Sequence, residues 1–373
     1  PWKVFKAEEL FQNITDKNHP DETVLTIIQG KGTLPREQAG RNIHYDDASL
    51  SNYKKVEQGD FIIHLRSFEG GLEMANEAGI VSPAYTILRC KRPHSSLFYD
   101  AYFHTDEFIN HNLSKSVEGI RDGRQISYEA FKWLGIPYCE PTEQEKISNL
   151  FAALNERIAK QRDLVMSLKK YKRGVMRAIF RDKSFVFSKA TVWKSIRLGD
   201  ECVFFSGGTP KSTDSSYYGG SIPFIRSGEI HGEKTELFLT EAGLQNSSAK
   251  MVSKGDLLIA LYGATSGEVD ISKIDGAINQ AILCIRPYDM SKQYLRYLLE
   301  DSKDDIINTY LQGGQGNLSA EIIKNLRVDM PDSTAQSSVV EFLSMIERRI
   351  EMSIAECEQI QAMKRSLIQQ LFI

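Results

Sequence analysis

The sequence has little of what extracellular proteins and metal-binding folds require. It holds five cysteines among 373 residues, an odd number with no Cys-x-x-Cys spacing. That pattern argues against a disulfide framework or a zinc knuckle and favours a reduced, cytoplasmic protein. No apolar run approaches the length that spans a bilayer, and the start shows no signal-peptide pattern. The chain begins at Pro1 rather than methionine, which leaves open whether natural residues precede it.

The motifs of several enzyme classes are missing as well. There is no Pro-Pro dipeptide, as in the Asn/Asp-Pro-Pro-aromatic motif of amino-methylating enzymes, and no Glu-x-Lys triplet, the usual ending of a Mg²⁺ nuclease site. Gly207–Ser212 lacks the glycine before the lysine of a phosphate loop, and Pro210 removes an amide donor. Gly313–Gly316 does not follow an apolar strand, as a dinucleotide fingerprint would. The seven histidines form no spaced metal set with the cysteines. We therefore expect a non-catalytic chain without a metal or cofactor of its own.

The net charge of the chain is small, but basic residues are concentrated in one segment. The net charge is −3, which by itself argues against a nucleic-acid-binding protein. The segment from Lys160 to Lys183, however, contains nine basic and two acidic residues, a net charge of 9 − 2 = +7. Two interpretations stay open at this point: a solvated basic helix face, or a helix end that lies near a polyanion or an acidic partner.

A long helix is predicted over Thr142–Phe180. Its apolar residues recur in steps of four and three, a seven-residue repeat typical of a helix that packs along another helix. Polar residues interrupt the repeat at Gln161 and Lys172. The predicted seam is formed by Ile147, Phe151, Leu154, Ile158, Val165, Leu168, Val175 and Ile179.

The same seam recurs near the C-terminus at a constant offset of 192 residues. Its polar interruptions recur too, as Ser353 and Lys364. Two copies of one seam predict that the helices pair with each other, and antiparallel pairing keeps the two lysines at opposite ends. The second seam is formed by Val339, Leu343, Ile346, Ile350, Cys357, Ile360, Leu367 and Leu371.

The segment before the first long helix reads as mixed α/β. Residues rich in β-branched or large apolar side chains predict strands over Thr23–Ile28, Phe61–Leu65 and Thr86–Leu88. Helices are predicted over Ser95–Ser114 and, capped by Ser127, over Tyr128–Leu134. Gly30–Ser51 is polar and turn-rich and is predicted to be a long loop.

The segment between the long helices repeats this order. Trp193-Lys194 corresponds to Trp2-Lys3, and Gly255-Asp256 corresponds to Gly59-Asp60 at an offset of 196 residues. A slowly varying offset indicates small loop insertions around a shared frame, so the chain is a tandem duplication of about 190 residues. We predict an α+β fold of two α/β domains, residues 1–141 and 185–331, each followed by a long helix, residues 142–184 and 332–373, with the two helices paired.

The polar, glycine-rich loops suit contact with nucleic acid. Arginine bonds guanine edges, Asn and Gln bond adenine, and hydroxyls suit phosphate oxygens. For each loop residue taken singly, an ordinary surface turn is the better interpretation, but the whole set on two repeated domains favours DNA contact. The predicted DNA-binding residues are Lys31, Arg36, Arg41, Arg66, Arg124, Lys211, Ser212, Thr213, Tyr217, Arg226, Ser227, His231, Tyr262, Gln315 and Asn317.

These repeated motifs carry a family resemblance over nearly the whole chain. The run Gly123–Ser127, continued through Phe131–Pro137 into Glu143–Ile147, and the paired segments Gly207–Pro210 and Ile222–Ile225 are its most specific parts. In them the chain resembles the specificity subunit of a type I restriction–modification system. The second copy departs from the pattern, with Ala335–Ser338 where the first has Glu143–Lys146. That departure puts one of two equivalent partner contacts in doubt.

The resemblance implies a function and a set of partners. Each domain would read one half of a split, asymmetric target in the major groove of double-stranded DNA. The two long helices would form an antiparallel coiled coil that sets the spacing. At ~1.5 Å per residue a helix of about 38 residues spans roughly 55–60 Å, enough to reach successive major grooves about 34 Å apart. Two modification subunits would carry S-adenosylmethionine and methylate adenine, and restriction subunits would cleave DNA using ATP and Mg²⁺. None of that chemistry is expected in this chain.

Three other classes of protein remain as alternatives. A stand-alone two-domain DNA-binding scaffold or regulator would have to bind without partners, which the near-neutral charge disfavours. A second alternative is an enzyme with an unrecognised site. The absence of acid/base or metal clusters at the repeated positions argues against it. A purely structural coiled-coil adaptor would leave the long polar loops unexplained.

Overall fold

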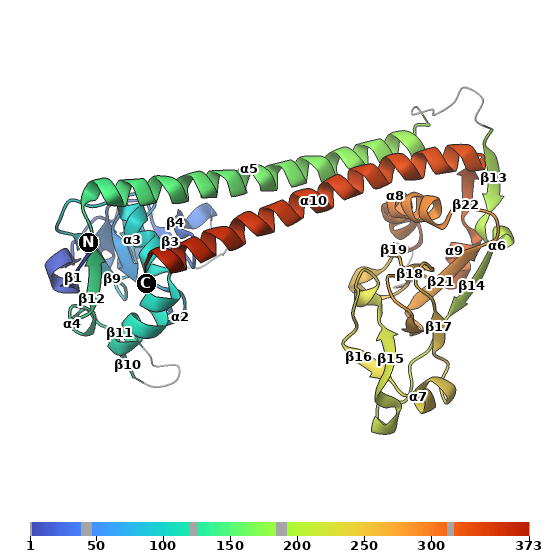
Figure 1. The fold of residues 1–373 in the computed structure, drawn as a ribbon, viewed down its shortest axis with the longest axis horizontal. Helices are drawn as coiled ribbons and strands as arrows, with labels where there is room; N and C mark the ends of the chain where they lie inside the picture. The colour runs from blue at the N-terminus through green and yellow to red at the C-terminus, as the bar shows by residue number, and fades with distance from the viewer. Residues whose placement is uncertain (1, 39–46, 120–124, 184–191, 312–316, 373) are drawn as a thin grey trace. The chain divides into compact units, whose positions relative to one another are not determined.

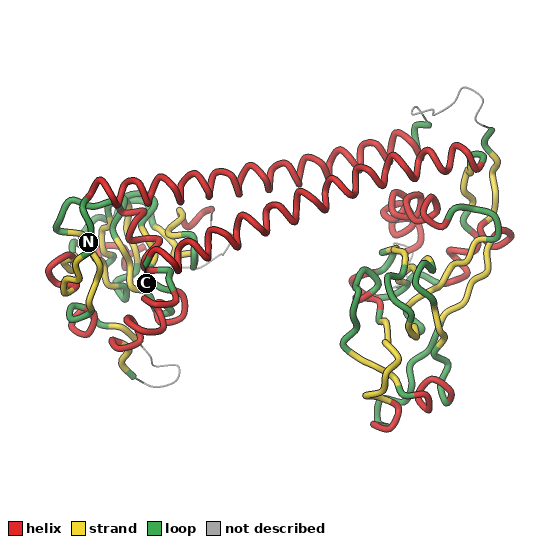
Figure 2. Tube along the Cα trace, in the orientation of Figure 1, coloured by secondary structure: helices red, strands yellow, loops and turns green. Residues whose placement is uncertain are grey.

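The structure, a computed structural model, describes residues 2–38, 47–119, 125–183, 192–311 and 317–372 (Figures 1 and 2). The chain divides into two compact units. The first contains residues 1–163 and 354–373, and the second contains residues 164–353. Each unit combines a domain with a piece of both long helices, α5 (Pro141–Phe180) and α10 (Ser333–Leu371).

The first unit is built on a four-stranded antiparallel sheet. Its strand order is β2 (Phe11–Ile14), β9 (Thr86–Cys90), β6 (Phe61–Ile63) and β7 (Glu73–Met74). Four strand pairs surround it: β1 (Lys3–Lys6) with β12 (Gly135–Tyr138), β3 (Leu25–Ile28) with β4 (Gly32–Pro35), β5 (Lys54–Val56) with β8 (Gly79–Val81), and β10 (Val117–Glu118) with β11 (Gln125–Ile126). Its short helices are α1 (Ala7–Leu10), α2 (Ser67–Gly70), α3 (Ser96–Phe103) and α4 (Tyr128–Phe131).

The second unit repeats that sheet. Its strands run in the order β14 (Cys202–Ser206), β21 (Ile282–Pro287), β18 (Leu257–Ala260) and β19 (Val269–Ile271). β13 (Lys194–Arg197) pairs with β22 (Arg327–Met330) as β1 does with β12. A second four-stranded sheet has the order β16 (Leu237–Leu239), β15 (Tyr218–Ile225), β20 (Gly276–Ile278) and β17 (Lys250–Val252). The helices are α6 (Leu198–Glu201), α7 (Glu241–Gln245), α8 (Lys292–Leu311) and α9 (Ala320–Asn325).

One turn shows why the repeat is visible in the sequence. Gly59 and Gly255 have φ angles of +90° and +91°, a backbone conformation that side chains disfavour. The next residue is a buried aspartate in both copies, and it accepts a hydrogen bond from the amide three residues before it, Glu57 or Ser253. An arginine on the neighbouring strand then neutralises each carboxylate. The predicted α+β fold and its tandem repeat are confirmed.

The two long helices run antiparallel in each unit (Figure 1), as the seams predict. In the first unit Ile147, Phe151, Leu154 and Ile158 share a core with Cys357, Ile360, Leu367 and Leu371. Of the fifteen seam residues predicted besides Cys357, eleven are buried, and Val165, Leu168, Leu367 and Leu371 are half-buried. The polar seam residue Gln161 donates to Glu356 at 3.1 Å.

The sequence departure at Ala335–Ser338 keeps one structural contact of the first copy. The Gln144 side chain accepts from the Ser95 amide at 2.9 Å and donates to the Cys139 carbonyl. Gln336 makes the same pair of bonds with Ser291 and Pro331. The glutamine therefore joins the first turn of α5 or α10 to the start of α3 or α8 in both units.

Three predictions about the first unit are wrong in their bounds. The helix predicted over Ser95–Ser114 ends at Phe103, because the Thr105 hydroxyl donates to the Tyr102 carbonyl and accepts from the Phe108 amide. The chain continues as a π turn over Glu107–Asn112 and a 3-10 turn over Leu113–Ser116. Part of the loop predicted over Gly30–Ser51 is strand β4. The helix capped by Ser127 ends at Phe131 rather than Leu134.

Candidate nucleic-acid interface

The predicted contacts of the first unit lie on turns around its small strands. Lys31 is exposed at the turn between β3 and β4, and Arg36 is half-buried at the start of a 3-10 turn, Arg36–Gln38. Arg66 is exposed just before α2. Arg41 and Arg124 lie outside the described residues.

A buried carboxylate holds the turn that carries Lys31. Glu73 is fully buried and accepts hydrogen bonds from the amides of Gly30 at 2.6 Å and Gly32 at 2.8 Å. Burial opposes its charge, but the hydrogen bond with His104 and the two amides prevail and lower the pKa of Glu73. Sequence reasoning missed Glu73, because nothing local marks a single glutamate in a short strand.

The predicted contacts of the second unit form two groups, at opposite ends of β15. Lys211, Ser212 and Thr213 are exposed in the loop before the strand, and Tyr217 is half-buried in a 3-10 turn, Ser215–Tyr217. The Tyr218 hydroxyl ties this loop down by donating to the Pro210 carbonyl at 2.8 Å.

The second group gathers where β15 ends. Ser227 begins a 3-10 turn, η7 (Ser227–Glu229), which lies against another, η8 (Gly263–Thr265), directly after the exposed Tyr262. Leu318 donates its amide to the Leu261 carbonyl at 3.0 Å, which places the exposed Asn317 beside the Tyr262 segment. Gln315 lies outside the described residues.

Arg226 belongs to this group by position but is engaged within the protein. Its Nε and one terminal nitrogen donate to Glu229 at 3.1 and 3.2 Å, and that nitrogen also contacts Glu236. Two carboxylates therefore compete with any base edge for the N–H donors of this guanidinium. The contact closes the turn between β15 and β16.

His231 is likewise held by carboxylates. Its Nδ1 lies 2.8 Å from Asp270, and its Nε2 lies 3.4 Å from Glu268. The hydrogen bond with Asp270 raises the pKa of His231, so the ring carries a positive charge over a wider pH range. Asp270 and Glu268 were missed by sequence reasoning, since they lie 39 and 37 residues away along the chain.

Neither interpretation of the basic run holds for three of its members. Lys172 is buried and lies 2.7 Å from both Glu300 and Glu347. Arg181 pairs with Asp301 and Asp305, and Lys183 pairs with Asp329. These cations are neither simply solvated nor free for a polyanion, because each is neutralised inside the second unit.

The glycine pair in the predicted Gly207–Pro210 motif has a packing reason. A Cβ on Gly207 would lie 1.7 Å from the Ile278 carbonyl oxygen, and one on Gly208 would lie 2.5 Å from the Ser248 side chain. Only glycine lets the backbone pass β20 this closely. The motif positions the loop that presents Lys211.

We expect Gly207→Ala to destabilise the second unit by about 2–3 kcal/mol, because a backbone carbonyl must move to admit the methyl group. Urea unfolding followed by circular dichroism measures the loss. Gly228→Ala is the matched control, since a Cβ there meets nothing within 4 Å, and it should change stability by less than about 0.5 kcal/mol. Equal losses in the two variants would contradict the packing explanation.

Two chemical possibilities are limited by the described parts of the chain. Within them, no group of three or more His, Cys, Asp or Glu side chains is arranged to hold a metal ion. None of the helices found there is long and apolar enough to cross a membrane.

Comparison with known proteins gives a consistent picture. Residues 191–362, under half of the chain, match the family model of the type I restriction modification DNA specificity domain. The MjaX specificity subunit of Methanocaldococcus jannaschii is 24% identical over 258 residues, 65% of this chain and 59% of that protein. The MjaVIII specificity subunit of the same organism is 22% identical over 335 residues, 84% of this chain and 78% of that protein.

The fold has solved counterparts. A type I restriction–modification S subunit from M. genitalium aligns over 100% of this chain and 96% of its own, with a TM-score of 0.58 and 15% identity. At that identity the likeness concerns the fold alone. It matches the α+β architecture found here, with repeated sheets and two long helices.

Proposed function

We propose that this chain, which belongs to the specificity subunits of type I restriction–modification systems, is the DNA sequence-recognition subunit of such a complex. Residues 1–141 and 185–331 would each read one half-site of a bipartite, asymmetric target. The helices of residues 142–184 and 332–373 would serve as the spacer. One observation carries the proposal: the same four-stranded sheet occurs twice with different loops attached.

The loops supply suitable chemistry for such reading. In the second unit, Lys211 and the neighbouring hydroxyls suit phosphate oxygens, whereas Tyr262 and Asn317 suit base edges and sugar. The group before β15 would therefore position the domain on the DNA backbone, and the group after β15 would select the bases. The engaged Arg226 would hold the loop shape rather than contact a base.

The partners and cofactors follow from the same proposal. Two modification subunits would bind the chain and carry S-adenosylmethionine for adenine methylation, and restriction subunits would use ATP and Mg²⁺ to cleave unmodified DNA. The chain would work in the cytoplasm on double-stranded DNA, without an active site of its own. The net charge of −3 fits a subunit that relies on partners for much of its affinity.

Methylation-aware sequencing tests the proposal. The chain is co-expressed with its modification subunits in a host that lacks the system, and the genome is compared with that of a host without this chain. We expect a split motif of methylated adenines that depends on the chain. In a Lys211→Ala, Tyr262→Ala double variant, the second half of the motif should relax while the first is retained.

Two results would count against the proposal. An unchanged methylome with all subunits expressed would favour a stand-alone DNA-binding scaffold. Relaxation of both half-sites in the double variant would contradict reading by separate domains. The control Asp289→Asn changes an exposed residue of the loop before α8 that belongs to neither group, and it should keep the full motif.

A further inference from the structure

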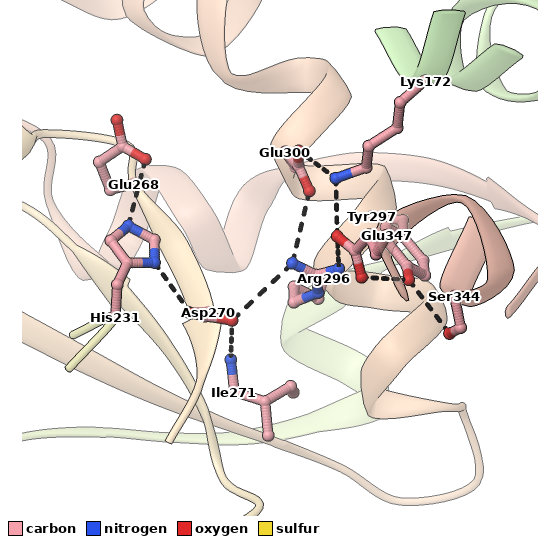
Figure 3. A network of polar contacts seen from close by, with 10 residues as sticks. All are labelled: Lys172, His231, Glu268, Asp270, Ile271, Arg296, Tyr297, Glu300, Ser344 and Glu347. Carbon is pink, nitrogen blue, oxygen red and sulfur yellow. Dashed lines mark hydrogen bonds and ion pairs between the residues drawn. The ribbon is translucent and has the colours of Figure 1, made fainter. Parts of the chain in front are cut away.

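Asp270 of β19 lies at a junction in the second unit (Figure 3). One carboxylate oxygen is 2.8 Å from Nδ1 of His231, in the segment that follows η7. The other oxygen accepts from the Ile271 amide at 2.8 Å and lies 3.8 Å from the Arg296 guanidinium of α8. Asp270 thus faces the proposed DNA-contacting loops on one side and a helix on the other.

The contacts continue from Arg296 to the helical pair. Arg296 donates to Glu347 of α10 at 2.5 Å and lies 3.6 Å from Glu300. Both glutamates accept a hydrogen bond from the Lys172 ammonium of α5 at 2.7 Å. We call His231, Asp270, Arg296, Glu347 and Lys172 the second-unit network. Its charges alternate in sign from the loop to the seam lysine.

The first unit has a counterpart at the same topological positions. Phe61 pairs with Met74 as Leu257 pairs with Ile271, so Glu73 of β7 occupies the place of Asp270. Glu73 holds the amides of Gly30 and Gly32 on one side and lies 3.4 Å from His104 on the other.

A seam lysine of the same unit, Lys364 of α10, is half-buried near the inner end of this counterpart. His104 lies 3.7 Å from the Asp100 carboxylate of α3. Burial lowers the pKa of the Lys364 ammonium, and the nearby Asp100 carboxylate opposes that shift. Asp100 and His104 stand 196 residues before Arg296 and Glu300, and Lys364 stands 192 residues after Lys172. We call Glu73, His104, Asp100 and Lys364 the first-unit network.

The two networks use different residues but the same order of charge. From the loop inward, each runs through a carboxylate, a cation, a carboxylate and a seam lysine. Buried ion pairs add little net stability over an apolar core, because desolvation offsets their attraction. In some proteins such pairs instead fix one geometry. The recurrence of the same order with different residues therefore indicates a shared role in positioning.

We propose that Asp270 and Glu73 are positioning residues, which orient the DNA-reading loops of their own units through these networks and so contribute to half-site selectivity. The inference rests on the proposed function. It adds that a seam lysine in a long helix influences which bases a loop accepts. Each network should act on its own half-site, since each is contained within one unit.

The test uses the complex of this chain with its modification subunits and a DNA library with both half-sites randomised. We expect Asp270→Asn to lower selectivity at the second half-site about tenfold, the effect of losing one charge-assisted hydrogen bond, and to leave the first unchanged. Glu73→Gln should do the reverse. Lys172→Met should resemble Asp270→Asn although it lies in a helix, and Lys172→Arg should restore most selectivity.

A matched control separates positioning from loss of charge. Lys170 is exposed on α5, two residues before Lys172, and Lys170→Met should leave both half-sites unchanged. Thermal unfolding identifies any variant that fails to fold. If Asp270→Asn fails to fold, the comparison of Lys172→Met with Lys172→Arg tests the inference instead. Equal selectivity in Lys172→Met and the wild type, or equal loss at both half-sites, would overturn the inference. A wild-type complex that selects no split site would instead refute the proposed function.

Discussion

Glu347→Ala is expected to destabilise the second unit by about 3–5 kcal/mol, the typical cost of leaving buried charge without its partner. The Glu347 carboxylate accepts from Lys172 at 2.7 Å, Arg296 at 2.5 Å and the Tyr297 hydroxyl at 2.6 Å. The side chains of Lys172 and Arg296 are each 11% exposed, so neither can move easily into water. Burial opposes the charge of Glu347, but these bonds prevail and lower its pKa.

Hydrogen exchange of backbone amides measures where this stability is lost. Protection should fall in residues 164–353 and change little in residues 2–38 and 47–119, since the network lies within the second unit. Glu351→Ala is the control, because Glu351 is exposed one turn further along α10 and lines the same surface pocket as Lys172, Glu300 and Glu347. It should change stability by less than about 0.5 kcal/mol. Similar losses in the two variants would show that the ion pairs contribute nothing beyond helix surface charge.

The parts of the fold that the sequence predicted are those set by local constraints. A glycine with φ near +90° and a capping aspartate must recur wherever the turn recurs, as at Gly59 and Gly255. The seam of α5 and α10 is likewise set by the helical period. These features predicted the duplication, the long helices and their pairing before any coordinates, and the family resemblance added the antiparallel direction.

The failures have tertiary causes. The helix predicted over Ser95–Ser114 has suitable apolar spacing, but the Thr105 side chain takes over backbone hydrogen bonds and ends α3. The ion pairs of Arg226 with Glu229 and Glu236 were likewise not foreseen, although its predicted contact with DNA stays a prediction. A propensity or a residue type does not reveal such competition, because the competing group is chosen by the fold.

The networks were also beyond sequence reasoning alone. Asp270, Arg296 and Glu347 are spread over three elements, and no spacing rule joins them. A usable signal existed in the repeat offsets, since Lys172 and Lys364 interrupt both seams at one position. Comparing charge rather than identity between the copies would have pointed to Asp100 and His104 as well.

Asp256→Asn is expected to destabilise the second unit by about 2–3 kcal/mol at neutral pH, because a buried, charge-assisted set of bonds is lost. Asp256 is 4% exposed and accepts from the Ser253 amide at 3.0 Å, from Arg286 at 2.6 Å and from Lys292 at 3.1 Å. Burial opposes its ionisation, but the bonds from Arg286, Ser253 and Lys292 prevail and lower its pKa from 3.8 to about 2.

The sign of the pH dependence follows from that lowered pKa. The unfolded chain binds this proton more tightly than the folded one, so the carboxylate stabilises the fold fully above about pH 4 and progressively less as the pH falls towards about 2. The difference in unfolding free energy between the wild type and Asp256→Asn should therefore be constant from about pH 7 to 5 and narrow below about pH 4. Urea titrations at each pH measure it.

A control isolates this carboxylate from the general effect of acid. Asp289 is exposed in the loop before α8, and Asp289→Asn should leave the free energy of unfolding within about 0.5 kcal/mol of the wild type. A wild-type advantage over Asp256→Asn that persists undiminished at about pH 2 would mean that the bonds survive protonation. The stabilisation would then come from shape and hydrogen bonding rather than charge, and the Asp256 turn would resemble an ordinary capped turn instead of an ion-paired one.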